Sequence, residues 1–260
     1  MHKIVYSGRS LLLGSLLFTC FTNMALAIVN MDDLHFKGQK ESFSGSVSLA
    51  ASSVSGNSDQ SNINLSGQIQ WNGDEYINLF VLGHEYGKSS GQRNVNNSFV
   101  HARHVRRYSE SLDYEFYSQL EENEFTRLNY RGLYGTGLRI PFWDTDSHIA
   151  FLGLGGFREV EKISDQDGES GGEIRRTGRW NFYLMSRYKG ERVIFSNTLY
   201  WQPRIAYFPD RRALFVSVLK IRANKKLSMM LKLEVAHDSQ PPTGVEATDK
   251  RIKTGFEYEF

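Results

Sequence analysis

The chain has 260 residues, and its 31 Lys and Arg residues nearly balance its 29 Asp and Glu residues, giving a formal net charge of +2. This balance argues against a nucleic-acid-binding protein, which would need an excess of basic residues. Aromatic residues make up 13% of the chain, and no stretch beyond the first 27 residues is long and apolar enough to predict a membrane-spanning helix.

The N-terminus has the three parts of a secretory signal peptide. Lys3 and Arg9 give it a basic start, residues 11–21 are apolar, and Ala25-Leu26-Ala27 is a small-x-small cleavage site. The apolar run is short for a spanning helix. We therefore expect residues 1–27 to be removed, leaving a mature chain of residues 28–260.

The only cysteine, Cys20, lies within this expected leader. A lipoprotein cysteine is an alternative, but Thr19 stands where a small residue usually precedes such a cysteine. A mature chain without disulfides is compatible with a closed β-barrel, in which pairing of all the strands supplies the stability.

The mature chain alternates apolar and polar residues, the period-2 pattern of a β-strand with two different faces. Residues 112–121 are the clearest case, because Leu112, Tyr114 and Phe116 alternate with Asp113 and Glu115. The pattern predicts about twelve strands, at residues 42–51, 62–71, 76–86, 95–107, 112–121, 126–140, 147–159, 174–188, 193–201, 213–222, 227–237 and 250–260.

The connections predict how these strands are arranged. Short turns such as Asn72-Gly73 alternate with longer loops, for which we expect residues 87–94, 162–172, 202–212 and 238–249; residues 141–146 are expected to form a turn. An even strand number places both termini on one side, which is the periplasm in outer-membrane barrels. The sequence thus predicts one all-β domain, an antiparallel up-and-down transmembrane barrel over residues 28–260.

The last strand carries a further signal. Phe256, Tyr258 and Phe260 end the chain on one face of the alternation. This ending resembles the C-terminal signal by which outer-membrane barrels are recognised and inserted as their closing strand. It implies that the barrel-assembly machinery is a partner.

A soluble β-barrel that binds a ligand would also alternate, with its apolar face inward. Two observations favour the opposite polarity: the expected strands are about twice the usual length of soluble strands, and aromatic residues gather at strand ends. Charged residues of the other face are then expected in the lumen, either as a salt-bridge lattice or as a charged narrow pore. The candidate lumen-lining residues are Asp113, Glu115, Glu121, Arg127, Arg131, Arg139, Arg175, Arg179 and Arg187.

The histidines do not form a recognisable catalytic or metal site. His101 and His104 are three residues apart and His237 adjoins Asp238, so in each pair the side chains point to opposite faces of a strand. His84 is expected to be able to face the lumen, but no partner can be assigned to it. We predict no catalytic residue, no metal site and no cofactor.

The loop before the last strand, together with an early turn, resembles a known family. His237-Asp238-Ser239-Gln240-Pro241-Pro242-Thr243-Gly244-Val245, then Thr248-Asp249, and the turn Gly56-Asn57-Ser58-Asp59 are similar to the YdiY-like family of salt-induced outer-membrane proteins (domain of unknown function 481). Ser55 departs from the threonine common there. Pro241, Pro242, Gly244 and Asp249 are interpreted as shaping the last outer loop.

The resemblance implies an outer-membrane location in a Gram-negative bacterium and a link to salt or envelope stress, without an established activity. We expect a narrow channel for small solutes or ions, or an envelope-stabilising protein, with outer-membrane lipid as a partner and no nucleic acid. A lipid- or peptide-directed hydrolase that uses His84 or His237 and a soluble periplasmic ligand binder remain as alternatives.

Overall fold

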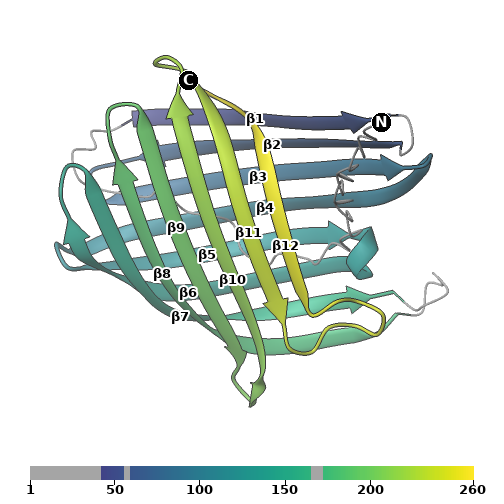
Figure 1. The fold of residues 1–260 in the computed structure, drawn as a ribbon. Helices are drawn as coiled ribbons and strands as arrows, with labels where there is room; N and C mark the ends of the chain where they lie inside the picture. Colours follow the sequence, from purple (N-terminus) through teal and green to yellow (C-terminus); the bar gives the residue numbers. More distant parts are fainter. Residues whose placement is uncertain (1–41, 56–58, 165–171) are drawn as a thin grey trace, which may run out of the picture.

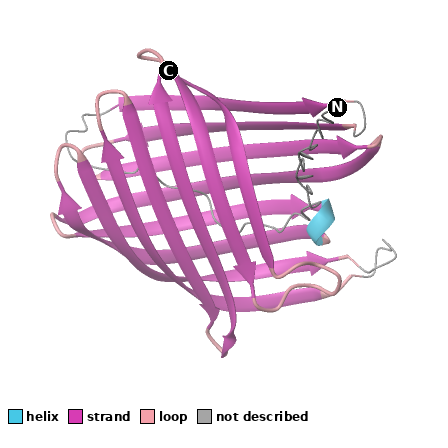
Figure 2. Cartoon of the chain, in the orientation of Figure 1, coloured by secondary structure: helices cyan, strands magenta, loops and turns pink. Residues whose placement is uncertain are grey.

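The computed structural model describes residues 42–55, 59–164 and 172–260. They form a closed barrel of twelve antiparallel strands (Figures 1 and 2). The strands are β1 (Ser42–Val54), β2 (Gln60–Asn72), β3 (Tyr76–Ser89), β4 (Gln92–Ser109), β5 (Leu112–Asn123), β6 (Leu128–Asp144), β7 (His148–Ile163), β8 (Ile174–Lys189), β9 (Val193–Arg204), β10 (Tyr207–Arg222), β11 (Leu227–Asp238) and β12 (Thr248–Glu259).

Each strand pairs with its neighbours in sequence, and β1 pairs with β12 to close the sheet. The predicted up-and-down barrel of about twelve strands is therefore confirmed. The barrel has a terminus end, where β1 begins and β12 ends, and a loop end, which carries the connection of residues 239–247 between β11 and β12. The expected signal peptide and the turn residues Gly56, Asn57 and Ser58 lie outside the described residues.

The strands are longer than the alternation predicted, and three expected connections are wrong. Residues 87–94 are mostly strand, and the turn is only Ser90-Gly91, both with positive φ. Pro141 lies within β6, next to a register shift. Proline has no backbone N–H group, and at such an irregularity the ladder does not require a hydrogen bond from it. Residues 202–212 contain only a two-residue turn, and another register shift lies between Tyr207 and Arg211. Bulges thus accommodate the residues that we took for strand breakers.

A short 3-10 helix, Glu124–Thr126, replaces the expected start of the sixth strand. The Asn123 side chain accepts hydrogen bonds from the backbone N–H groups of Phe125 and Thr126, and Arg127 then adopts a left-handed conformation with φ of 60°. β6 consequently begins at Leu128. The 3-10 helix is the one helical element among the described residues, and it is too short to cross a membrane.

The polarity of the barrel is inverted relative to a soluble protein. On β5, Phe116 is 55% exposed whereas Glu115 is 1% exposed, and on β11 Leu231 is 41% exposed whereas Glu234 is 6% exposed. Apolar side chains therefore cover the outside of the closed sheet, and charged side chains lie inside it. This arrangement defines a transmembrane barrel, because lipid contacts only the outer face.

Aromatic side chains flank this apolar surface near both ends. Towards the terminus end, His148 packs against Trp143 and Tyr188, with ring centroids 6.2 and 4.7 Å away. Towards the loop end, Trp201 packs against Phe182 and Phe208, at 5.5 and 5.7 Å. Amphipathic rings in these positions are typical of the two girdles at the membrane interfaces.

The polarity predicts the effect of a charge on the outer face. Phe116→Arg places a cation near the middle of the lipid-facing band, so we expect a loss of about 2–4 kcal/mol in the free energy of unfolding from lipid vesicles. Phe142→Arg, the matched control near a strand end, should lose only about 0–1 kcal/mol. Equal losses for the two variants, measured by urea titration, would contradict the membrane position assigned to Phe116.

Candidate functional site: the barrel interior

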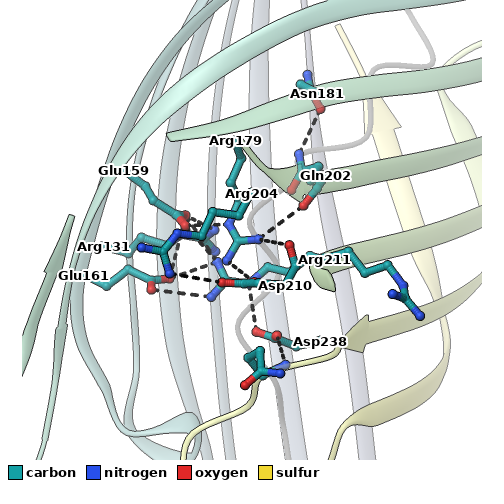
Figure 3. A network of polar contacts seen from close by, with 12 residues as sticks. Arg131, Glu159, Glu161, Arg179, Asn181, Gln202, Arg204, Asp210, Arg211 and Asp238 are labelled. Carbon is teal, nitrogen blue, oxygen red and sulfur yellow. Dashed lines mark hydrogen bonds and ion pairs between the residues drawn. The ribbon is translucent and has the colours of Figure 1, made fainter. Parts of the chain in front are cut away.

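The interior of the barrel has a packed side and a hollow side. On the packed side, at the loop end, Glu159 is fully buried among three arginines (Figure 3). Its carboxylate pairs with Arg131, with Arg179 at 2.8 Å and with Arg212 at 3.2 Å. Three cations around one carboxylate offset the cost of burying it, provided that they have further partners.

Those further partners are carboxylates on neighbouring strands. Glu121 pairs with Arg131 at 3.1 Å, and Asp210 pairs with Arg179 at 2.8 Å. Arg212 also pairs with Glu161 at 3.0 Å and with Asp238 at 2.8 Å. The network therefore joins β5, β6, β7, β8, β10 and β11 across the interior, and it fixes these strands relative to one another.

A second group of contacts continues the packed side towards the terminus end. Glu115 accepts hydrogen bonds from Arg103 at 2.8 Å and from the Tyr183 hydroxyl at 3.0 Å. The Arg139 guanidinium lies 4.2 Å from the centroid of the Phe151 ring. Around them lies an apolar cluster of Ile77, Leu79, Val81, Val105, Ile149, Phe151, Tyr183, Met185, Tyr200, Leu214, Val216, Val218 and Ala236. These side chains fill this part of the interior.

The hollow side lies between β1–β5 and β10–β12 and contains a cavity of about 190 Å³. Ion pairs line it: Lys253 with Glu85 at 2.8 Å, Lys220 with Glu257 at 2.7 Å, and Lys232 with Glu234 at 2.5 Å. Val81, Phe99, Val218 and Met230 form an apolar part of the same wall. The cavity therefore offers both charged and apolar surfaces.

The cavity adjoins a wider hollow of about 970 Å³ at the terminus end, because Ser46, Gln68 and Glu257 line both. Towards the loop end, the cavity reaches Asn123, the last residue of β5, and Arg251 near the start of β12. The two neighbouring hollows thus lie along one side of the lumen.

A third hollow, of about 470 Å³, lies at the loop end over the packed side, and it is rich in arginine. Arg175, Arg179, Arg204 and Arg212 line it together with Glu173. Glu173 lies outside the strands, and the hydrogen bond that Arg175 donates to it lowers the pKa of Glu173. This hollow leads onto the Glu159 network.

The structure distributes the nine candidate lumen-lining residues among these regions. Glu121 lines the cavity, Arg175 and Arg179 line the loop-end hollow, and Arg187 lines the terminus-end hollow. Asp113, Glu115, Arg131 and Arg139 are buried in the packed side.

Arg127 occupies a different position from the one expected. It lies in the connection between β5 and β6, where its guanidinium donates to the backbone carbonyl oxygens of Ser164 at 2.7 Å and Thr243 at 2.8 Å. It therefore ties three loop-end connections together instead of lining the lumen.

The cavity wall includes charged residues that the sequence analysis did not single out, among them Glu85, Lys220, Lys232, Glu234, Arg251, Lys253 and Glu257. A signal for several of them was present. Arg251, Lys253 and Glu257 form the charged face of the last strand, opposite Phe256 and Tyr258. Pairing that face with β11 would have placed Lys232 and Glu234 beside it.

The histidine positions correct one expectation. His84 points to the outer face of β3, where its Nδ1 lies 2.9 Å from the Ser98 hydroxyl, so it does not face the lumen. His237 lies near the loop end of β11, with Nδ1 2.9 Å from the Thr248 hydroxyl. Within the described residues, no three His, Cys, Asp or Glu side chains are grouped to hold a metal ion.

The expected outer-loop residues separate into two groups. Pro241, Pro242 and Gly244 lie in the β11–β12 connection, where Gly244 has φ of 83° and the Val245 N–H donates to the Pro242 carbonyl at 3.0 Å. Asp249, in contrast, belongs to β12, and its buried side chain pairs with Arg251 at 3.6 Å. Asp249 therefore contributes to the interior and not to the loop.

Comparison with known structures places this molecule in the class of outer-membrane β-barrels. It resembles an outer membrane channel from Pseudomonas putida F1, at a TM-score of 0.51 and 13% identity over 90% of this chain and 100% of that one. It also resembles the NanC porin, at a TM-score of 0.51 and 8% identity over 83% and 98% of the two chains. These similarities concern the fold.

The family follows from a match over residues 47–260 to the model described as "Protein of unknown function, DUF481". The chain belongs to this family, which confirms the resemblance that the last loop suggested. A comparison with curated proteins gives no match.

The charge network predicts that Glu159 is a principal stabilising residue. Glu159→Gln leaves Arg131, Arg179 and Arg212 with less negative charge to share, so we expect a loss of about 3–5 kcal/mol in the free energy of unfolding. Glu173→Gln removes an exposed carboxylate that pairs with Arg175, and its loss should be much smaller, because solvent screens an exposed ion pair. Equal stability of the two variants in urea titrations would show that the buried network does not stabilise the barrel.

Proposed function

We propose that this protein is a narrow passive channel in the outer membrane of a Gram-negative bacterium. The observation that carries the proposal is the cavity between β1–β5 and β10–β12, which adjoins the terminus-end hollow and extends towards the loop end. Twelve-stranded barrels lie between small barrels filled by their own side chains and wide porins. Here one side is filled, so only the other side is available to a solute.

The lining of the cavity supports passage of small polar solutes or ions without strong preference for one charge. Inward-facing Glu85, Glu121, Glu234 and Glu257 balance Lys220, Lys232, Arg251 and Lys253. Opposite charges that face each other across a narrow space orient dipolar solutes and replace part of their hydration.

A second function, stabilisation of the envelope, has support from the Glu159 network. Six strands share this network, and ion pairs of this kind make the loop-end part of the wall rigid. A role under salt or osmotic stress, which the YdiY-like resemblance implies, belongs to the same proposal. An outward His84 removes the support for a luminal hydrolase, and the apolar exterior argues against a soluble periplasmic binder.

The orientation and assembly of the protein are part of the proposal. Residues 1–27 serve as the signal peptide, residues 28–260 form the mature protein, and both termini face the periplasm. Phe256 and Tyr258 face outward on β12, and Phe260 exchanges two backbone hydrogen bonds with Gly45, at 3.1 and 2.9 Å. The outer, aromatic face of β12 is accessible, which suits this closing strand to recognition by the barrel-assembly machinery.

The channel proposal predicts single-channel steps in planar bilayers and a charge-dependent selectivity. Lys253→Glu replaces a cavity cation that pairs with Glu85, so the reversal potential in a KCl gradient should shift towards cation preference. Lys88→Glu makes the same charge change on the outer side of β3 and should shift the potential much less. Absence of conductance steps from the folded protein would remove the channel function and leave the structural one.

A further inference from the structure

The seam that closes the barrel is much shorter than the other strand pairings. β1 pairs with β2 over thirteen residue positions, from Ser42 to Val54, whereas it pairs with β12 only from Ser46 to Leu49. β12 in turn pairs with β11 over eleven positions, from Thr248 to Tyr258. Both strands are therefore regular, and they are fully paired on their other sides.

The missing pairing lies on the loop-end side of the seam. Gly45 and Phe260 exchange backbone hydrogen bonds at the terminus end, and the ladder then runs as far as Leu49 opposite Phe256. Ala50 still lies against Gly255, but residues 51–54 of β1 and 251–254 of β12 are not paired with each other. Figure 1 shows β1 and β12 meeting near the C-terminus and diverging towards the opposite end. We call this opening the seam wedge.

The seam wedge opens within the apolar surface of the barrel. At its edges, Leu49 is 52% exposed and Ile252 is 73% exposed. On the strands behind them, Ile63 pairs with Ala51, and Leu233 pairs with Ile252. Backbone N–H and C=O groups that face an opening in this region need partners, because hydrocarbon supplies none.

The seam wedge also borders the luminal cavity. Ser48 and Ala50 on β1, and Arg251 and Lys253 on β12, line that cavity from the two edges of the opening. The cavity wall combines these cations and their carboxylate partners with the apolar side chains of Val81, Phe99, Val218 and Met230. Its volume of about 190 Å³ is enough for several water molecules or for part of one acyl chain.

We propose that the seam wedge is a lateral portal through which one acyl chain of a membrane lipid enters the cavity. The lipid is the neighbouring medium, its chain matches the apolar part of the wall, and its polar head can bond backbone groups of β1 and β12 at the edges of the wedge. Arg251 and Lys253 lie where a phosphate or carboxylate of the head would stand. The portal opens into the same cavity as the proposed channel, but its tests do not depend on conductance, so either proposal can fail without the other.

The opening itself is tested by cysteine pairs in a Cys20→Ser background, oxidised in native outer membranes. Val47→Cys with Tyr258→Cys joins a pair inside the ladder and should form a disulfide. Ser53→Cys with Ile252→Cys continues the same register six residues further, beyond the contact between Ala50 and Gly255, and should remain largely reduced. Equal disulfide yields for the two pairs would show a closed seam and overturn the portal.

Lipid entry is tested by photolabelling the folded protein in nanodiscs with a phospholipid that carries a diazirine on its acyl chain. Mass spectrometry should find adducts on luminal Phe99 and Met230 as well as on lipid-facing Phe116. Ala50→Trp, which places a ring in the portal, should reduce the luminal adducts at least threefold and leave those on Phe116 unchanged. Ala51→Trp, which points the same ring outward, is the matched control and should change neither.

Two results would overturn lipid entry. One is absence of luminal adducts while Phe116 is labelled. The other is an equal luminal yield in the Ala50→Trp and Ala51→Trp variants, which would show that lipid reaches the cavity by another route.

Discussion

The structure depends on one constraint, which is that backbone polar groups surrounded by hydrocarbon must find partners within the protein. A closed antiparallel sheet meets this constraint wherever neighbouring strands pair, and the period-2 alternation then decides which side chains contact lipid. The same alternation places charged groups inside, where they must pair with one another. The Glu159 network and the ion pairs around the cavity are consequences of this requirement.

The interior satisfies the constraint in two different ways. On the packed side, buried arginines bridge carboxylates from several strands, and an apolar cluster fills the remaining space. On the hollow side, small residues such as Ser46 and Ser48 on β1 leave room for a cavity. The division explains how a twelve-stranded barrel can be stabilised by interior contacts on one side and remain partly open on the other.

Much of this arrangement was predictable from the sequence, because side chains at odd and even positions of a strand point to opposite faces, and this parity decides which of them are exposed. The outward faces of residues 112–121 and 227–237, the strand number and the closing strand all follow from alternation. Pro141 and Pro209 misled the assignment of turns, since β-bulges next to them keep the chain in the sheet. Parity also placed Glu115 and Arg139 inside the barrel.

Parity does not reveal which inward residues border empty space. Arg131 and Lys253 both face inward, yet Arg131 is enclosed by Glu121 and Glu159 whereas Lys253 lines the cavity. That difference depends on side chains from strands distant in sequence. The same is true of the short seam, because the sequence of β12 continues its alternation past the point where pairing with β1 ends.

The central claim is that the apolar face of the sheet contacts lipid and the charged face does not. The most direct measurement is a nitroxide scan of residues 112–123 in lipid vesicles, with collision rates recorded for oxygen and for a water-soluble nickel chelate. The account predicts that Tyr114, Phe116 and Leu120 positions collide strongly with oxygen, while Glu115 and Gln119 positions show low oxygen collision and restricted motion. Oxygen collision without a period of two, or nickel collision concentrated at the positions of Tyr114, Phe116 and Leu120, would contradict it.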